Sequence, residues 1–570
     1  MTSREIKKIF LDFFKKKDHK IYPSSPLLPK DKTSLFTSAG VQQFLKDILK
    51  GEFKEKRVAN SQICLRTDDI EEVGDDVHLT FFEMLGNWSF GDYWKKEAIE
   101  WAYEFVVNVL SLPKERIWVT VFKGEKGIPE DKESEKIWKS LGIKKILKKG
   151  KEDNFWGPIG NEGPCGPCTE LHFEKDNGEL VEIWNLVFME YKKEKENYLP
   201  LPQKVVDTGI GLERLTAVCQ KKETIFETDA FDFLIKRIEK ETSFSYKKNP
   251  ALFRVIADHI RAVVFVIAED VFPSNVKEGY VLRRLLRRIF LREKKINAPQ
   301  NLLPKLIEEV ISFFEKEFPY LREKEKFIKE VVKEEKERYL KTISQAMKEF
   351  EKMLKKKKEK IISGKEAFFF YETYGMPLEE IKEIAKEKGF EVDEKGFEKE
   401  KQKHKEISKK GKEKIFEMVF EEDIKKPHTA THLLQASLRK ILGKKVRQEG
   451  SRLKKGELSF DFSFDRKLTP EELKKVEELV LQKIKENLKV RCKKMPLEKA
   501  IKEGALAFYK ERYPDEVFVY EIYNEKTGEI FSKEICKGPH VKETGEIKNF
   551  KIIKEEGIGR GKRRIKAKVE

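Results

Sequence analysis

One stretch of the sequence is the most informative about the fold: Val205-Val-Asp-Thr-Gly-Ile-Gly-Leu-Glu-Arg-Leu215. It predicts an apolar strand, a loop opened by Gly209 and Gly211, and a helix that begins near Leu212. Glycine allows the backbone to approach a phosphate closely, and Arg214 would project from the first turn of the helix. The third glycine of a dinucleotide-binding fingerprint is absent, which disfavours a Rossmann site. An ordinary strand–helix turn explains the stretch equally well.

Two pairs of metal-binding residue types occur near the end of the sequence. His428 and His432 are spaced i, i+4 on a helix predicted for 428–440, after Pro427, so both imidazoles can face one point. Cys536-Lys-Gly-Pro-His540 offers a thiolate and a third imidazole at the same spacing. A lone pair of histidines is more often a core or surface feature, but the second pair favours one tetrahedral Zn²⁺. Four protein ligands leave no open position for a metal-bound water, so the ion would organise the site.

A third stretch, Gly163-Pro-Cys-Gly-Pro-Cys168, contains the cysteine spacing of thioredoxin-like redox motifs. Such a motif needs its first cysteine at a helix N-terminus, where the pKa of the thiol is lowered. Here a second Gly-Pro precedes the pair, and a strand-like Thr169-Glu-Leu-His-Phe173 follows it. We therefore expect a packed loop and no redox centre.

The composition excludes several classes of protein. The 570 residues have room for about three or four domains, too many for a single binding module. Hydrophobic and charged residues each make up 39%, with 41 Phe and 7 Trp, which excludes a mostly disordered chain. The sequence has no apolar run of ~18 residues, no secretory signal and no disulfide framework, so we expect a cytoplasmic protein without a membrane partner. The net charge of +18 favours a polyanionic partner such as nucleic acid, although the ion-pair networks of a thermophile explain it as well.

The pattern divides the chain into three regions. Residues 1–240 mix helices, glycine-rich loops and short strands such as Arg116–Phe122. Residues 241–410 are mainly helical, and Phe253–Ala268 is apolar nearly all round, which predicts a buried helix. Tyr280–Phe290 repeats Arg-Arg at i and i+4, placing Arg283, Arg284, Arg287 and Arg288 along one helix face. Such a face is usually solvated, and its functional interpretation is contact with an RNA backbone.

Residues 411–570 predict a separate α+β domain. Within Leu458-Ser-Phe-Asp-Phe-Ser-Phe464 the apolar residues alternate strictly with Ser and Asp, which indicates a half-buried strand. Val517–Tyr523 is a second strand candidate.

Together these stretches resemble the alanyl-tRNA synthetase family. In chain order the matching motifs are Leu35–Phe44, Phe81–Asp92, Asp153–Trp156, Gly163–Cys168, Glu182–Phe188, Val206–Arg214, Pro273–Asn275 with Gly279–Arg284, His428–Leu434 and Cys536–His540. The matches run from residue 4 to about residue 565, nearly the whole chain. So many long motifs in one order leave little room for chance.

The resemblance implies a class II synthetase fold of the α+β class. An antiparallel sheet core would occupy residues 1–240, a helical tRNA-recognition domain and tether 241–410, and a zinc-containing α+β editing domain 411–570. The implied enzyme activates L-alanine with ATP and Mg²⁺ to alanyl-adenylate and transfers alanine to the 3′ end of tRNA(Ala). Its editing domain would hydrolyse mischarged Ser- and Gly-tRNA(Ala), because one small group is worth only ~1–3 kcal/mol of discrimination.

The resemblance also assigns roles to individual residues. Arg66 would hold the α-phosphate and Arg214 the distal phosphates, while Asp207 would pair with the ammonium group of alanine. Trp156 and Val187 would wall a pocket only a methyl group deep. Further substrate-binding positions are His78, Met84, Asn185, Gly209 and Gly211. The editing residues would be Gln448 and the zinc ligands His428, His432, Cys536 and His540.

Two positions would read the wobble G·U pair of the acceptor stem. Asn275 matches the asparagine that the family uses, and Glu372 stands where an aspartate is usual. Glu372 keeps the carboxylate on a longer arm.

Other features depart from the family pattern. Residues 67–74, after Arg66, form a shorter loop than is usual in bacteria and lack its ATP-binding lysine, so phosphate binding would depend on Arg66, Arg214 and His78. We expect neither the β-barrel linker nor the C-terminal domain of the family, and therefore a monomer whose basic surface binds tRNA. The alternatives are a non-catalytic RNA-binding paralogue and a synthetase for another small amino acid.

Overall fold

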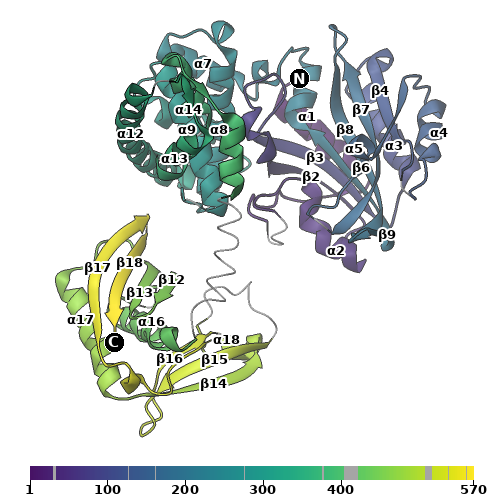
Figure 1. Cartoon of the computed structure of the whole chain (residues 1–570). Coiled ribbons are helices and arrows are strands. Elements are labelled where there is room, and N and C mark those ends of the chain that lie inside the picture. Colours follow the sequence, from purple (N-terminus) through teal and green to yellow (C-terminus); the bar gives the residue numbers. More distant parts are fainter. Residues whose placement is uncertain are drawn as a thin grey trace. The chain divides into compact units, whose positions relative to one another are not determined.

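The computed structural model describes residues 1–29, 34–125, 127–160, 162–274, 276–357, 359–374, 376, 378–403, 421–443, 445–506, 516–536, 538–559 and 561–570. The chain forms two compact units, Met1–Lys356 and Lys357–Glu570 (Figure 1). The division into 1–240, 241–410 and 411–570 stays a prediction. None of the described helices is long and apolar enough to cross a membrane.

The described part of the first unit is built on one nine-stranded sheet (Figure 1). Its strands lie in the order β1-β2-β3-β9-β8-β7-β4-β5, and β6 pairs with β7. The strands are β1 (Lys20–Ile21), β2 (Arg57–Leu65), β3 (Phe81–Phe90), β4 (Ile117–Phe122), β5 (Ile146–Lys149), β6 (Phe155–Trp156), β7 (Gly163–Glu174), β8 (Leu180–Glu194) and β9 (Asn197–Gly211). Neighbours from β2 through β4 are antiparallel, while β1–β2 and β4–β5 are parallel. The antiparallel core and the strand predicted at Arg116–Phe122 are confirmed, the strand beginning one residue later.

Alternation along the central strands gives the sheet two different faces. One face packs through Leu186 and Ile210 against Phe10 of α1 and against α6. The other carries Trp88 and Val187, and this face is the one that is hollowed into a cavity. The helices of the unit are α1 (Ser3–Lys15), α2 (Leu45–Lys50), α3 (Lys95–Tyr103), α4 (Lys132–Ser140), α5 (Lys151–Asn154), α6 (Leu212–Cys219), α7 (Asp232–Thr242), α8 (Pro250–Ala268), α9 (Lys277–Lys295), α10 (Leu302–Phe314), α11 (Tyr320–Glu323) and α12 (Glu325–Lys356).

Helix α8 confirms the predicted buried helix. Every residue from Phe253 to Ala268 is buried, in a core shared with α7, α9 and α10. Its Phe265 stacks on Phe81 of β3 with ring centroids 4.6 Å apart, so α8 packs directly against the start of that strand.

The described residues of the second unit form two antiparallel sheets and one small parallel sheet, in which Ile361–Ile362 pairs with Glu391–Val392. One antiparallel sheet has the strand order β12-β13-β18-β17 and the other β14-β15-β16. The strands are β10 (Ile361–Ile362), β11 (Glu391–Val392), β12 (Gln448–Lys454), β13 (Glu457–Ser463), β14 (Lys489–Pro496), β15 (Glu516–Tyr523), β16 (Ile530–Ile535), β17 (Phe550–Gly559) and β18 (Lys562–Val569), and the helices are α13 (Gly364–Tyr374), α14 (Leu378–Glu387), α16 (Glu421–Leu442), α17 (Pro470–Lys485) and α18 (Leu497–Lys502). In β13, Leu458, Phe460 and Phe462 are buried while the residues between them are not, which confirms the half-buried strand. The strand predicted at Val517–Tyr523 is confirmed as β15.

Three local predictions are wrong. Gly163–Cys168 is the start of β7 and no loop, because a Cβ on Gly166 would lie 2.0 Å from the Phe188 carbonyl oxygen and only glycine lets the two strands approach so closely. No loop precedes α6 either, since β9 stays paired with its neighbours up to Gly211. Helix α16 begins at Glu421, so Pro427 lies inside it, where a proline removes one backbone hydrogen bond.

Candidate functional site

The strand register builds the floor of a cavity on the open face of the sheet. Asp207 of β9 lies opposite Trp88 of β3 on one side and opposite Val187 of β8 on the other. One step along the same face, Asn185 lies opposite Gly209. The cavity has a volume of about 440 Å³, and every substrate-binding and catalytic position predicted from the sequence lines it: Arg66, His78, Met84, Trp156, Asn185, Val187, Asp207, Gly209, Gly211 and Arg214.

Asp207 is a buried carboxyl group with a single strong donor. It is only 6% exposed, and the Trp88 indole N–H donates to its Oδ1 at 2.6 Å. Burial raises the pKa of Asp207 to about 7, and the hydrogen bond from Trp88 opposes part of that shift. The indole fits because Gly40 and Gly86 carry no side chain; a Cβ at either would lie 2.8 Å or 2.3 Å from its ring. The site therefore offers a carboxylate that a cation could bind in place of water.

Two guanidinium groups also line the cavity. Arg66 follows β2 and lies over the Phe82 ring, its guanidinium carbon 5.1 Å from the ring centroid. Arg214, in the first turn of α6 as predicted, contacts Glu182 with Nη1 3.1 Å from Oε2. The third predicted phosphate ligand, His78, is hydrogen-bonded to Asp75. An anion with several phosphates has two guanidinium groups to bind here.

Six carboxylates besides Asp207 line the cavity, and none was predicted as a site residue; Glu170 and Glu182 are two of them. Glu170 of β7 accepts a hydrogen bond from Asn185 at 3.0 Å, and Glu182 of β8 is the partner of Arg214. Burial raises the pKa of Glu170, and the nearby Glu182 charge adds to that effect. Glu182 opens one of the quoted motifs and Glu170 belongs to an alternating strand, but neither pattern indicates a ligand. The pairing of β7 with β8 is what brings them together.

The second unit brings the four predicted metal ligands together. One donor atom from each of His428, His432, Cys536 and His540 lies within 4.8 Å of all the others. The Cys536 sulfur lies 3.2 Å from Nε2 of His428 and 3.4 Å from Nε2 of His540. Burial lowers the pKa of His428 and of His432 to about 4 and that of His540 well below its usual value. Neutral imidazoles and one thiolate are the donors that a structural Zn²⁺ requires, so the residues fit this ion.

A further carboxyl group lies behind this cluster. Glu534 is 4% exposed, and its Oε2 lies 3.8 Å from Nδ1 of His432. Metal-binding histidines commonly direct their second ring nitrogen at such a group. No sequence pattern marks Glu534 as a candidate, although it lies two residues before Cys536.

Comparison with known proteins places this arrangement in a family. A model described as "tRNA synthetases class II (A)" matches residues 5–450, and one described as "Threonyl and Alanyl tRNA synthetase second additional domain" matches residues 517–566. An alanine–tRNA ligase from Borrelia hermsii is 42% identical over 100% of this chain and 99% of its own length. The chain belongs to the alanine–tRNA ligase family.

Other members of the family differ in length. An alanine–tRNA ligase from Treponema denticola is 42% identical over 100% of this chain and 99% of its own length, whereas one from Thermotoga maritima is 39% identical and is covered over 80% of its length. Among solved structures, an apo S. aureus histidyl-tRNA synthetase covers 40% of this chain and 68% of its own, with 9% identity and a TM-score of 0.28, and it supports no argument. The class II synthetase fold expected from the sequence is confirmed by the family model.

Gln448 and Glu372, which the family resemblance also implied, belong to the second unit. Gln448 begins β12, where its side-chain amide donates to Ser451 Oγ at 3.1 Å. Glu372 is exposed on α13. Asn275 lies outside the described residues.

Proposed function

We propose that the protein is an alanine–tRNA ligase that uses the cavity of its first unit for both chemical steps. The alanine carboxylate attacks the α-phosphate of ATP, forming alanyl-adenylate and releasing pyrophosphate. A ribose hydroxyl at the 3′ end of tRNA(Ala) then attacks the carbonyl carbon, and AMP leaves. The observation that supports this proposal most is that the buried carboxyl of Asp207 lines the same cavity as Arg66 and Arg214.

The proposed roles follow from charge and position. Asp207 binds the ammonium group of alanine, and Val187, its neighbour across β8 and β9, limits the side chain that fits beside it together with Trp156. Arg66 stabilises charge that develops on the α-phosphate, and Arg214 binds the distal phosphates. His78 assists the two arginines in binding phosphate, and the other proposed substrate-binding positions, Met84, Asn185, Gly209 and Gly211, also line the cavity.

Magnesium would enter this cavity with ATP. Hard carboxylate oxygens are its preferred protein ligands, and Glu170 and Glu182 are the residues that would hold it. The ion would neutralise phosphate charge during the first step. A divalent cation would also offset the repulsion between these two carboxylates.

The test is ATP–pyrophosphate exchange with the full chain. We expect exchange to depend on alanine, with serine and glycine weaker and threonine inactive. Exchange that responds best to another amino acid would support a synthetase for that amino acid, and no exchange at all would support a non-catalytic RNA-binding paralogue.

The second unit is proposed to hydrolyse Ser- and Gly-tRNA(Ala). One Zn²⁺ held by His428, His432, Cys536 and His540 would organise the site, with Gln448 acting on the mischarged end. The match of residues 517–566 to an additional domain of threonyl and alanyl tRNA synthetases supports this assignment. Deacylation of Ser-tRNA(Ala) by the wild type but not by His432→Asn or Gln448→Ala tests it.

Recognition of tRNA is proposed to involve Asn275 and Glu372 at the acceptor stem. The excess of lysine and arginine over acidic residues would bind the phosphates of the tRNA backbone.

We propose that the enzyme acts as a monomer. Size-exclusion chromatography with light scattering should then give a mass near 67.1 kDa, and a mass of twice that value would refute the monomer.

A further inference from the structure

The β2–β3 loop, residues 66–80, lines part of the cavity. Arg66 lies at its beginning and His78 near its end, and Asp69, Val77 and Leu79 also line the cavity. The position of these side chains therefore depends on how the loop is held. The inference below rests on the proposed function, since it concerns residues that would bind ATP.

The outer side of this loop is bound by guanidinium groups from α8 and α9. Arg288 donates from Nη1 to Glu71 Oε2 at 2.6 Å, and Arg284 pairs with the other oxygen of Glu71. Further along the loop, Arg254 contacts Asp76 Oδ1 at 2.8 Å and donates to the Gly74 carbonyl at 3.2 Å. Arg288 is only 4% exposed, so its charge is bound where water is largely excluded.

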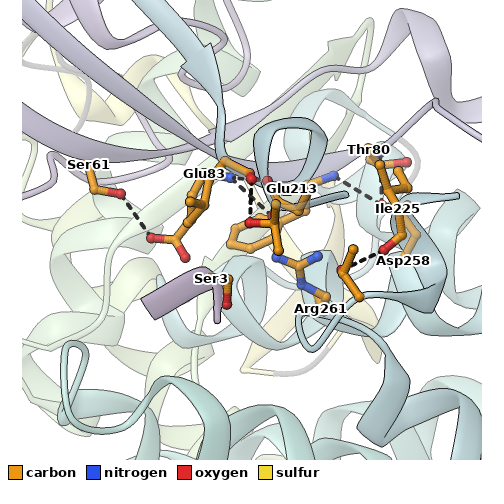
Figure 2. Close-up of polar contacts among 12 residues, drawn as sticks. Ser3, Ser61, Thr80, Glu83, Glu213, Ile225, Asp258 and Arg261 are labelled. Atoms are coloured by element: carbon orange, nitrogen blue, oxygen red, sulfur yellow. Dashed lines mark hydrogen bonds and ion pairs between the residues drawn. The ribbon is translucent and has the colours of Figure 1, made fainter. Parts of the chain in front are cut away.

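Arg288 also continues a chain of hydrogen bonds into the protein. Its Nε donates to Nε2 of His259 at 2.9 Å, and the Nδ1 of His259 lies 2.8 Å from Asp258 Oδ2. Asp258 Oδ1 accepts from the backbone N–H of Thr80 at 3.0 Å (Figure 2). His259 and Asp258 are completely buried. We call Glu71, Arg288, His259 and Asp258 the loop network, because it joins the middle of the β2–β3 loop to its end.

The protonation state of His259 sets the direction of the hydrogen bonds in this network. Burial lowers the pKa of His259 to about 4, so the ring is neutral near pH 7. A neutral ring that accepts at Nε2 must donate from Nδ1, and Asp258 is placed to accept that proton. The network is therefore a single directed chain, from donor Arg288 to acceptor Asp258.

The same face of α8 also holds α6. Arg254, Asp258 and Arg261 are spaced i, i+4 and i+7, and Arg261 donates to Glu213 Oε1 at 2.6 Å. Glu213 in turn accepts from the backbone N–H of Glu83 at 3.2 Å (Figure 2). One buried helix thus contacts the loop that follows Arg66, the beginning of β3 and the helix that carries Arg214.

We propose that Glu71 is a positioning residue of the activation reaction, which through the loop network holds the β2–β3 loop where Arg66 and His78 meet the nucleotide. Glu71 does not line the cavity, so it acts through the residues that do. Arg66 is the only lysine or arginine among residues 66–80, and rigid support of the loop keeps its guanidinium group in place.

Steady-state exchange kinetics of Glu71→Ala and Glu71→Gln test the proposal. Losing a charge-assisted hydrogen bond that orders the loop should raise the KM for ATP about tenfold in Glu71→Ala, with a smaller rise in Glu71→Gln. The KM for alanine should stay within about twofold, since Asp207 and Val187 lie on strands outside the loop. Hydrogen exchange should show faster exchange in peptides covering 66–80.

Glu315→Ala is the matched control. Glu315 pairs with Arg322 at 2.7 Å and its side chain is 37% exposed, against 36% for Glu71, but it lies at the end of α10 away from the cavity. Its KM for ATP should equal that of the wild type. A KM for ATP in Glu71→Ala within about twofold of wild type, or an equal rise in the KM for both substrates, would overturn the proposal. Wild-type protein without alanine-dependent exchange would instead refute the proposed function.

Discussion

Replacing Trp88 by phenylalanine should move the pH dependence of alanine activation. The substitution removes the one indole N–H that donates to Asp207 at 2.6 Å, in a site that is almost closed to water. In its proposed role, Asp207 must be ionised to bind the ammonium group of alanine. Its pKa is already raised to about 7 by burial, and the Trp88 hydrogen bond is what holds it from rising further.

The size of the effect follows from the energy of that bond. A hydrogen bond to a charged group contributes ~1.5–3 kcal/mol, and one pKa unit corresponds to about 1.4 kcal/mol. Loss of the donor should therefore raise the pKa of Asp207 by about one to two units. At pH 7 the variant would bind alanine weakly, and raising the pH to about 9 should restore much of the binding.

The assay is kcat/KM for alanine in ATP–pyrophosphate exchange, measured from pH 6 to pH 9.5, because this ratio reports the pKa of the free enzyme. The midpoint of the acid limb should move upward by at least about one unit in Trp88→Phe. Trp184→Phe is the control: Trp184 is also fully buried, and its Nε1 has no hydrogen-bond partner among the described residues. An unmoved acid limb in Trp88→Phe, or an equal shift in both variants, would refute the reasoning.

Three further predictions concern stability, metal and tRNA. Asp207→Asn should raise the melting temperature at pH 8 but hardly at pH 4. The pKa of Asp207 is about 7 in the folded state against 3.8 for an ordinary carboxyl, so its burial destabilises the wild type progressively as the pH rises between these two values. Equal shifts of the melting temperature at both pH values would contradict this reasoning. His432→Asn should abolish zinc binding, measured by atomic emission, and should also abolish deacylation of Ser-tRNA(Ala). ATP–pyrophosphate exchange with alanine should stay near the wild-type rate. Loss of exchange together with deacylation would argue against two separate sites. If the net charge of +18 supplies the phosphate contacts, the affinity for tRNA(Ala) in filter binding should fall by at least about a hundredfold between 50 and 200 mM KCl. An affinity that does not change with salt would exclude such contacts.

Periodicity and motif order predicted much of the fold. The strict alternation in Leu458–Phe464 was sufficient for β13, because a half-buried strand requires only a period of two. The apolar run Phe253–Ala268 was sufficient for α8. The four candidate metal ligands could be grouped from the sequence because the members of each pair lie four residues apart, and the structure brings all four together.

The register between strands and the close approach of one strand to another could not be predicted from periodicity. The bond between Trp88 and Asp207 depends on β3 pairing with β9 at one particular offset, which nothing in either strand specifies locally. The wrong assignment of Gly163–Cys168 has a related cause. Turn-forming residues indicate a loop, but Gly166 serves here to bring β7 against Phe188 of β8, and that neighbour is remote in the sequence.

The arginine face of α9 shows why a charge pattern alone did not indicate its partner. Helical spacing puts Arg283 and Arg287 in one row and Arg284 and Arg288 in another, and this is all that the sequence determines. The four arginines do not form a simply solvated face, since none of them is exposed, and the RNA contact stays a prediction. The first row pairs with Glu335 of α12, which is only 2% exposed, and the second with Glu71 of the β2–β3 loop. Because these four cations already lie against carboxylates of the first unit, we expect the proposed tRNA binding to depend mainly on other lysines and arginines. Neutralising Arg283 or Arg287 should then cost stability without flattening the salt dependence of tRNA binding.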